Sequence, residues 1–495
     1  MLSSSRLLSV LCVLVLIAAG ARQAAAQAPF GNPFASAETL RKQRGDTAHA
    51  TLRLRYEVGG DANAEQAAGG LVIELAPDWA HVRRQGHRAL YDFRLGRVLD
   101  LREDGFVSRN LVGSVAFRIY ERQNRTMLSA TIRGAGGGDQ ISACDSDTEL
   151  GLAIPGAKDT ASVSIKPSAT DVTLECNGGV IGAFGPGSGD AAPATLWPVL
   201  AHVITLHPAL RSELIKDGRV PRHIKSAFAV MGARKETSWR LVSAEAISVP
   251  YPLAGDLKNA TAAWIDKAVA PGLGDLAAAA VAGHAGKGPP TLADWEAEVG
   301  RVAKAKGPAA AVFAAWPALN MFPQVAQVCP SALQSAVCGS IRGLAATAQT
   351  DTAVRALLLV IQAEQARRPA DAVAAMLAAR SSPLADHPAL AAAFALALQG
   401  GGPSMAQQAK AAGLPSDAKA LHVRALQAYP YNPAYWTDLG DYFTRAYDLF
   451  TAYALYDVAL SLQMPDAQRG NAVLTGKRRL ATRIQGDFPA FFLPK

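Results

Sequence analysis

The sequence predicts an α+β protein in which an N-terminal curved antiparallel β-sheet domain with helices is followed by an all-α solenoid of helical hairpins. Three observations support this fold class. From Thr47 onward, apolar residues alternate with polar residues, as they do in half-buried strands. The strand pattern ends near Asp256, where Ala-rich segments typical of helices begin. Residues 432–465 contain two amphipathic helices spaced as a packed hairpin.

Residues 1–27 have the three-part organisation of a secretory signal peptide. Arg6 precedes an apolar run from Leu7 to Gly20, and the small residues of ARQAAAQA follow. The run is short for an uncleaved membrane anchor, and no later stretch has the length and apolarity of a transmembrane helix. We therefore expect an exported protein, and its richness in Ala, Gly and Arg favours the bacterial periplasm.

The charge of the chain excludes nucleic acid as a favoured partner. Cleavage after residue 27 removes Arg6 and Arg22 but no acidic residue, so the net charge falls from +8 to +6. No Lys/Arg run is longer than residues 477–479, and nucleic-acid binding needs a stronger basic patch. Because 50% of the 495 residues are apolar, the chain can form two or three domains with real cores.

Four cysteines remain after the predicted cleavage, which is an even number in an exported chain and so suggests disulfides. The pairing that closes the shortest loops joins Cys144 to Cys176 and Cys329 to Cys338. The spacing does not suit a metal site, and a CxxC redox motif is absent from the sequence. We expect neither a metal nor another cofactor.

Residues 28–46 are predicted to be a disordered lead, and residues 47–252 to form one α+β domain. Within residues 51–58, Leu52, Leu54 and Tyr56 share one face of a strand. Helices are expected at residues 111–132 and at 195–216, the second broken at a proline. Further strands are expected at residues 71–75, 81–84, 88–94, 97–102, 106–108, 161–165, 171–176, 180–184, 224–231 and 238–249.

Residues 253–398 are predicted to be an Ala-rich helical region, because Ala is the best helix former and lets helices pack closely. This composition is typical of an α-solenoid. The expected helices lie at residues 259–269, 292–305, 309–316, 331–348, 352–367, 371–380 and 389–398.

The hairpin within residues 399–495 has a large-on-small packing pattern. Trp436, Leu439 and Phe443 recur at i, i+3 and i+7 of the first helix. Gly440 lies beside that face, where a missing side chain lets a second helix approach. The second helix carries Ala452, Tyr456 and Ala459 at helical spacing, and Pro465 ends it.

The order and spacing of these residues resemble the tetratricopeptide repeat, with Phe443 at the usual tyrosine position. Stepping back by the family's period of about 34 residues leads to Ala418, His422 and Ala425. Residues 416–429 are therefore predicted to be the second helix of a preceding repeat. The resemblance implies a short, irregular array of hairpins in residues 399–495, capped by a helix at 470–487.

The resemblance also implies a binding surface, because the concave face of the first helix holds the ligand in that family. On this chain the face corresponds to Thr437, Asp441, Thr444 and Arg445. The groove would be polar and mixed in charge, without the Lys and Asn cluster that clamps a peptide carboxylate. A peptide carboxylate is therefore not the expected ligand, and the repeat resemblance implies a protein partner of another kind.

An aromatic concentration accompanies the hairpin. Seven of the eleven tyrosines lie between Tyr429 and Tyr456, together with Trp436, Phe443 and Phe450. These rings either pack on the C-terminal helix or the β domain, or form an exposed anchor for a partner. Packing is the favoured interpretation.

No catalytic constellation stands out in the sequence. Asp145, Asp147 and Glu149 alternate as in a calcium loop, but Leu150 and Gly156 replace its glycine and closing glutamate, so an acidic turn is favoured. We therefore predict an exported, non-enzymatic scaffold or adaptor that binds a protein partner.

Two alternatives stay open beside the adaptor. One is a cell-envelope hydrolase with a site assembled by the fold from distant residues, for which the candidates are His81, His202, Asp145 and Glu236. The other is a carrier that binds an apolar ligand in the β domain, for which a dry, apolar concavity would be the signature.

Overall fold

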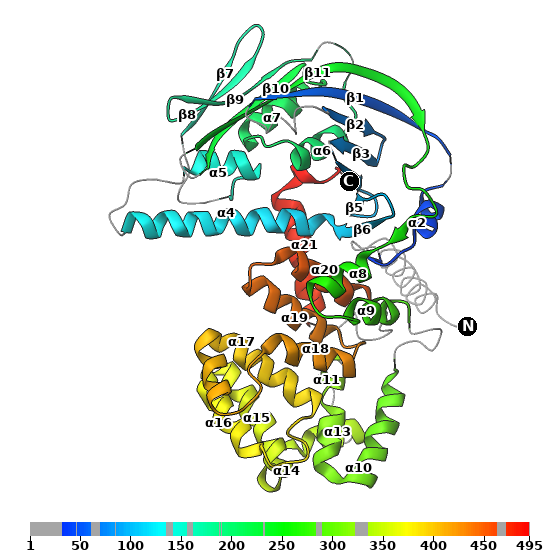
Figure 1. The fold of residues 1–495 in the computed structure, drawn as a ribbon, viewed down its shortest axis with the longest axis vertical. Helices are drawn as coiled ribbons and strands as arrows, with labels where there is room; N and C mark the ends of the chain where they lie inside the picture. Colours follow the sequence, from blue (N-terminus) through cyan, green and yellow to red (C-terminus); the bar gives the residue numbers. More distant parts are fainter. Residues whose placement is uncertain are drawn as a thin grey trace, which may run out of the picture.

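The computed structural model describes residues 32–45, 47–60, 70–84, 86–134, 142–155, 162–187, 189, 191–230, 233–283, 290–321, 335–462 and 472–494. A curved sheet lies at one end of the molecule, a helical array at the other, and a helical hairpin between them (Figure 1). The predicted α+β class is confirmed. The arrangement of the hairpins as a tetratricopeptide solenoid stays a prediction.

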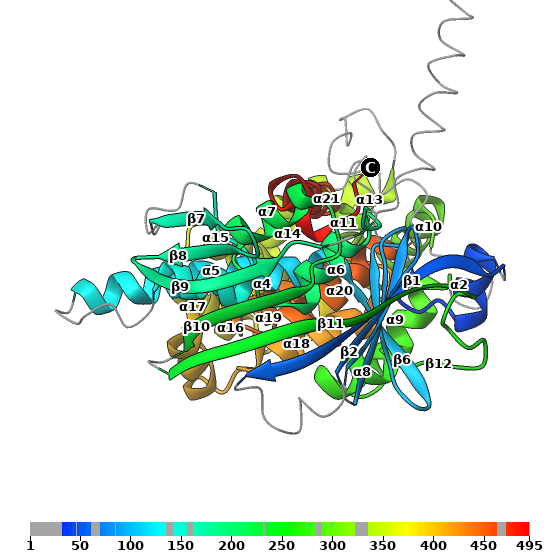
Figure 2. The same ribbon diagram turned by 90° about the horizontal axis from the view of Figure 1, so that it is seen from above.

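The sheet has twelve strands in the order β12-β6-β5-β4-β3-β2-β1-β11-β10-β9-β8-β7. Two antiparallel meanders are joined by the long pairing of β1 with β11, and β12 alone runs parallel to its neighbour β6. Figure 2 shows the sheet from above. The strands are β1 (His49–Gly60), β2 (Leu71–Leu75), β3 (Trp79–Arg84), β4 (His87–Asp92), β5 (Arg97–Leu101), β6 (Gly105–Asn110), β7 (Val163–Pro167), β8 (Val172–Cys176), β9 (Gly179–Gly185), β10 (His223–Val230), β11 (Ala233–Val249) and β12 (Lys258–Asn259).

Four helices lie on the concave side of the sheet: α4 (Leu111–Gly134), α5 (Ala143–Leu150), α6 (Leu196–Val203) and α7 (Pro208–Asp217) (Figure 1). The break before Pro208 falls where the sequence predicted it. Side chains of α6 and α7, including Leu200, Leu210 and Leu214, pack in one core with Leu54 and Ile73 of the strands. Helices therefore fill much of the concavity that an apolar-ligand carrier would need.

The predicted disulfide Cys144–Cys176 is confirmed and links α5 to β8, with a Cα–Cα distance of 6.5 Å. Cys338 is buried in α13. Its predicted partner Cys329 lies outside the described residues, so the second pair stays a prediction.

Part of the predicted disordered lead is a helix, α2 (Ala37–Arg44). Ser36 caps its N-terminus by accepting a hydrogen bond from the backbone N–H of Thr39. Arg44 is buried and forms ion pairs with Asp78 (2.6 Å) and Asp92 (2.9 Å). The expectation of disorder is wrong for this segment because its stabilising partners belong to the distant β3–β4 region.

The remaining helices form the second half of the molecule, and their alanines pack densely in the core of the array. In place of one predicted helix at 331–348, two short helices meet at Gly343. The helices are α8 (Thr261–Ala268), α9 (Leu273–Val281), α10 (Leu292–Ala315), α11 (Ala318–Met321), α13 (Ala336–Arg342), α14 (Leu344–Thr350), α15 (Thr352–Gln365), α16 (Pro369–Ala379), α17 (Pro388–Ala411), α18 (Ala418–Ala428), α19 (Pro433–Arg445), α20 (Leu449–Ser461), α21 (Ala472–Asp487) and the short 3₁₀ helix η1 (Pro489–Phe491).

Among the described helices, α17 alone passes a test of length and apolarity for crossing a membrane, and 50% of its apolar stretch is buried inside the protein. Gly402 has φ 66° and ψ −162°, and Pro403 follows it, so the helix is interrupted there. Each piece is shorter than the about 20 residues that a membrane span requires. Leu390 and Phe394 belong to the core of the array, which accounts for the apolarity of α17.

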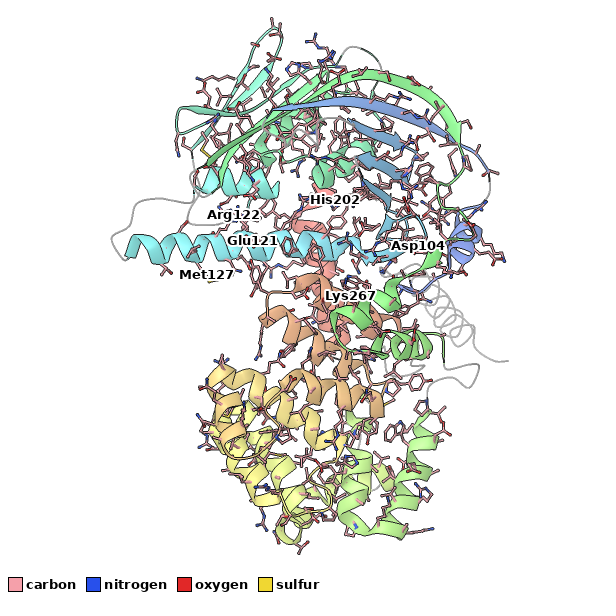
Figure 3. The ribbon with its side chains drawn as sticks, in the orientation of Figure 1. Asp104, Glu121, Arg122, Met127, His202 and Lys267 are labelled. Atoms are coloured by element: carbon pink, nitrogen blue, oxygen red, sulfur yellow. A yellow bond between two sulfur atoms is a disulfide. The ribbon has the colours of Figure 1, made fainter. Side chains whose placement is uncertain are left out.

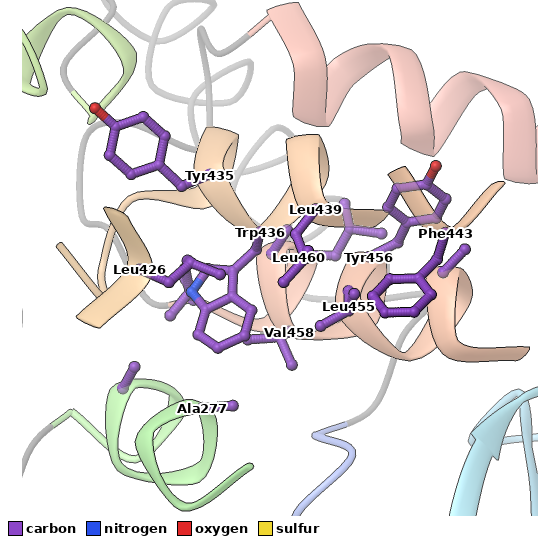
Figure 4. Packing of buried hydrophobic residues seen from close by; sticks show 14 of the residues in the cluster. Ala277, Leu426, Tyr435, Trp436, Leu439, Phe443, Leu455, Tyr456, Val458 and Leu460 are labelled. Atoms are coloured by element: carbon purple, nitrogen blue, oxygen red, sulfur yellow. The ribbon is translucent and has the colours of Figure 1, made fainter. Parts of the chain in front are cut away.

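The predicted hairpin is formed by α19 and α20. All six large and small packing residues of the prediction are buried, as Figure 4 shows for four of them. A Cβ atom on Gly440 would lie 2.4 Å from Cε1 of Tyr456, so the missing side chain is what admits the ring. Pro465 lies outside the described residues. The buried set is Trp436, Leu439, Phe443, Ala452, Tyr456 and Ala459.

Candidate functional site

The β domain and the hairpin meet through a buried charged group. Asp457 of α20 accepts hydrogen bonds from Arg97 of β5 (3.0 Å) and from Asn110 at the end of β6 (2.7 Å). Arg97 also donates to the hydroxyl of Ser108 (2.5 Å). Burial raises the pKa of Asp457, and the positive charge of Arg97 opposes that shift. The two halves of the chain therefore share one buried polar network.

Aromatic rings extend this junction along α4. Phe450 stacks on Phe117 at 5.1 Å, and Tyr447 packs on Tyr120 at 4.9 Å between ring centroids. A Cβ atom on Gly113 would lie 3.0 Å from the ring of Tyr453, so α4 and α20 approach closely there. These rings pack on the β domain, as the favoured interpretation predicted, but Tyr447 and Phe450 are still 39% and 41% exposed, so an anchor role for their outer faces stays a prediction.

A cavity of about 330 Å³ lies at this junction. Its walls come from β4, β5, β6, α4, α5, α6 and α20, so both halves of the chain contribute. This volume is at the lower end of the range for small-molecule sites. The lining residues are His87, Tyr91, Val98, Asp100, Arg109, Asn110, Gly113, Ser114, Phe117, Arg118, Glu149, Leu150, His202, Phe450, Tyr453, Ala454 and Asp457.

The carboxylates that line the cavity are each neutralised by an arginine. Asp100 forms an ion pair with Arg109, which also lies over the ring of Phe450 at 5.2 Å. Glu149 pairs with Arg125 at 2.5 Å. Asp457 pairs with Arg97 in the same way. The three described carboxylates that line the cavity therefore contribute no net negative charge.

Arg118 is the exception among the charged groups of the cavity. Its Nη1 donates to the carbonyls of Leu150 (3.0 Å) and Ala201 (2.9 Å), and its Nη2 donates to the carbonyl of His202 (2.9 Å). No described carboxylate forms an ion pair with it. Desolvation lowers the pKa of Arg118, as expected for a cation held in the protein by neutral carbonyls.

His202 is a neutral imidazole in the wall of the cavity. Figure 3 shows it between α4 and the strands. The ring stacks on Tyr91 at 5.3 Å, and Nε2 donates to the carbonyl of Phe491 at 3.1 Å, since a carbonyl can only accept. Burial, aided by the charge of Arg118, lowers the pKa of His202 to about 3. Such an imidazole is a poor proton acceptor and is unsuited to general-base catalysis.

The four residues expected on the concave face of the repeat have different surroundings. Thr437 is only 2% exposed and donates to the carbonyl of Pro433, so its side chain offers no surface to a partner. Asp441 and Thr444 both contact the hydroxyl of Tyr456. Arg445 is exposed. The face is thus occupied largely by contacts within the hairpin.

The candidates for an envelope hydrolase are not brought together. His81 contacts Glu74 (3.0 Å), and Asp145 accepts a hydrogen bond from the backbone N–H of Ala229 (2.8 Å). Glu236 is exposed and contacts Arg234, its neighbour on β11. Of the four candidates, only His202 lines the cavity.

The acidic segment predicted as a turn is helix α5. Asp147 pairs with Arg122 of α4 at 2.5 Å, and Glu149 pairs with Arg125. These carboxylates therefore hold α5 on α4. Among the described residues, no group of three or more His, Cys, Asp or Glu side chains is placed to hold a metal ion.

Sequence reasoning missed Arg118 and Asp457, the two residues that define the site. Asp457 did leave a signal, since it is the one charged residue in residues 449–461, LFTAYALYDVALS. A lone acid in an apolar helix is either exposed or paired inside. Arg118 left no such signal in the sequence, because its hydrogen-bond partners are backbone carbonyls, which every residue has.

In comparisons with known proteins, no family model, no curated protein and no solved structure matches this chain. The class is defined by the molecule's own geometry: an open-sheet α+β domain fixed to a helical hairpin, with a cavity at their junction. Membership of the tetratricopeptide family stays a prediction.

Proposed function

We propose that this protein is an exported, non-catalytic scaffold whose helical array holds a protein partner at a fixed position relative to the β domain. The observation that carries the proposal is the buried contact of Asp457 with Arg97 and Asn110. Breaking such a pair leaves an uncompensated buried charge, which resists hinge motion between sheet and hairpin. A scaffold needs that rigidity because it positions one surface relative to another.

The chemistry of the junction supports binding over catalysis. The imidazole of His202 has a pKa lowered to about 3 and is held by a backbone carbonyl. The cavity carboxylates are paired with arginines. An imidazole with so low a pKa does not exchange a proton near neutral pH.

Export to the periplasm is part of the same proposal. It rests on the signal-peptide pattern of residues 1–27. The disulfide Cys144–Cys176 supports it, because disulfides persist in oxidising compartments.

Photo-crosslinking in cells tests the scaffold. A probe is placed at Arg445, which is exposed on α19, and in a second strain at Leu377, which is 41% exposed on α16. A control probe replaces Val242, which is 54% exposed on β11 of the sheet. We expect the same protein to be captured at Arg445 of the hairpin and at Leu377 of the array but not at the control, and to bind directly to the purified full chain. No capture, or the same set of proteins at all three positions, contradicts the proposal.

A further inference from the structure

The charge balance of the junction cavity leaves one positive charge without a counterion among the described residues. Asp100, Glu149 and Asp457 are each paired with an arginine. Within the described part of the chain, the guanidinium of Arg118 donates hydrogen bonds to three neutral carbonyls and lies 5.2 Å from the centre of the Phe491 ring. Burying a cation without a counterion is costly, so an anion at this position would stabilise the folded protein.

Arg118 also has N–H groups that form no hydrogen bond with the described residues. A guanidinium has five N–H groups, and three hydrogen bonds to carbonyls are formed. The two remaining N–H groups belong to Nε and Nη2, which form one edge of the guanidinium. When Nη2 donates to His202 through its hydrogen on the far side from Nε, the free Nε–H and Nη2–H are parallel and match the two oxygens of a carboxylate.

The rest of the cavity is suited to a flat, apolar ring of a ligand. Tyr91, Phe117, Phe450 and Tyr453 line it, and aromatic rings stack favourably in offset or edge-on arrangements. The volume of about 330 Å³ admits only a small ligand. Because Asp100, Glu149 and Asp457 are each paired with an arginine, Arg118 alone among the described lining residues is left to balance a ligand's charge, which favours a single negative charge over a phosphate dianion.

We propose that the junction cavity binds a small aromatic monocarboxylate, whose carboxylate pairs with Arg118 and whose ring lies among the aromatic side chains of α4, β4 and α20. This ligand site is separate from the surface for a protein partner and does not depend on it. Because β4, α4 and α20 all line the cavity, the bound acid would contact both halves of the chain.

Titration calorimetry on the purified full chain, with 2-naphthoate as the probe, tests the proposal. We expect one molecule to bind per chain, at least tenfold more tightly than the neutral 2-naphthylmethanol and the dianionic 2-naphthyl phosphate. No binding of 2-naphthoate overturns the proposal. Equal binding of the alcohol also overturns it, because the ring alone would then be recognised.

Two variants locate the site. Ala454→Leu adds volume to the cavity wall without removing a hydrogen bond and should weaken 2-naphthoate binding at least tenfold. Its matched control, Ala374→Leu on the exposed face of α16, should bind as the wild type does. Arg118→Lys keeps the charge and enough donors for the three carbonyls but lacks the planar edge, and should also lose tenfold or more. Thermal unfolding checks that each variant folds, and unchanged binding by both cavity variants overturns the proposal.

Discussion

The junction and the helical array are both built from packed helices, yet different interactions hold them together. The junction contains the buried ion pair of Arg97 with Asp457 and the stacked rings of Phe117 and Phe450. It also contains Gly113, whose missing side chain leaves room for the ring of Tyr453. The core of the array consists mainly of Ala, Leu and Val side chains, most of them on α15, α16 and α17. Apolar burial is non-directional, whereas a buried polar network is satisfied in one geometry only. The difference teaches that the junction specifies an orientation and the array supplies bulk stability.

Removing the buried acid of the junction should have the largest effect. Asp457→Ala leaves Arg97 buried without a counterion, so the free energy of unfolding should fall by about 3–5 kcal/mol. Urea denaturation followed by fluorescence measures the change. The control, Asp386→Ala, breaks an exposed ion pair with Arg424 in the array and should cost less than about 1 kcal/mol. Equal effects of the two variants would remove the distinction between junction and array.

Filling the space at Gly440 should have the next largest effect. In Gly440→Ala the new Cβ would meet the ring of Tyr456 at 2.4 Å, and overpacking of this kind costs about 1–3 kcal/mol. Gly339→Ala is the matched control, because beyond the backbone of helix α13 no described atom lies within 4 Å of the added Cβ. There the better helix propensity of Ala should stabilise by up to about 1 kcal/mol. Thermal unfolding of both variants checks the opposite signs, and stabilisation by Gly440→Ala would contradict the close helix contact.

Acid should weaken both regions, because each contains buried neutral histidines. Burial lowers the pKa of His202 to about 3, and those of His207, His387 and His422 to about 4. Below about pH 6.5 these groups bind protons in the unfolded chain but not in the folded chain, so stability falls as the pH falls.

Between pH 7.5 and 5.5 the loss should be about 1.4 kcal/mol for each such histidine. Urea denaturation at the two pH values measures it. The variant His202→Gln should remove about one histidine's share of the pH dependence, whereas His87→Gln, at an exposed position, should retain all of it. A protein equally stable at both pH values would refute the neutral burial of these groups.

The smallest effect is expected at the edge of the junction. Phe450 is 41% exposed and stacks on Phe117, so Phe450→Ala should cost about 0.5–1.5 kcal/mol for the lost ring pair, besides the small loss of apolar burial. The control is Val242→Ala on the exposed face of β11, which should change stability by less than about 0.5 kcal/mol. Differential scanning calorimetry measures the stability change of each variant. An effect of Phe450→Ala no larger than that of the control would make the stack incidental.

The sequence predicted elements with a strong internal period and missed those without one. Strands β1 to β6 and the α19–α20 hairpin follow from residue spacing alone. Strand β12 has only two residues, and therefore no period to detect. Helix α5 reads as a turn because its acidic residues favour turns, while the arginines that hold it lie on α4.

The site was harder to predict than the fold, because its residues form no local pattern in the sequence. Asp457 and Arg97 are separated by 360 positions, so neither predicts the other locally. The partners of Arg118 are main-chain carbonyls, which leave no trace in residue type. The aromatic concentration was visible, but its packing surface on α4 depends on tertiary structure.

Hydrogen exchange on the full chain carrying Asp457→Ala tests the central claim most directly, namely that the sheet and the hairpin are one unit distinct from the array. We expect amides of β5, β6, α4 and α20 to lose protection together, while α15, α16 and α17 keep theirs. Loss of protection confined to α20, or an equal loss throughout the array, would contradict the claim.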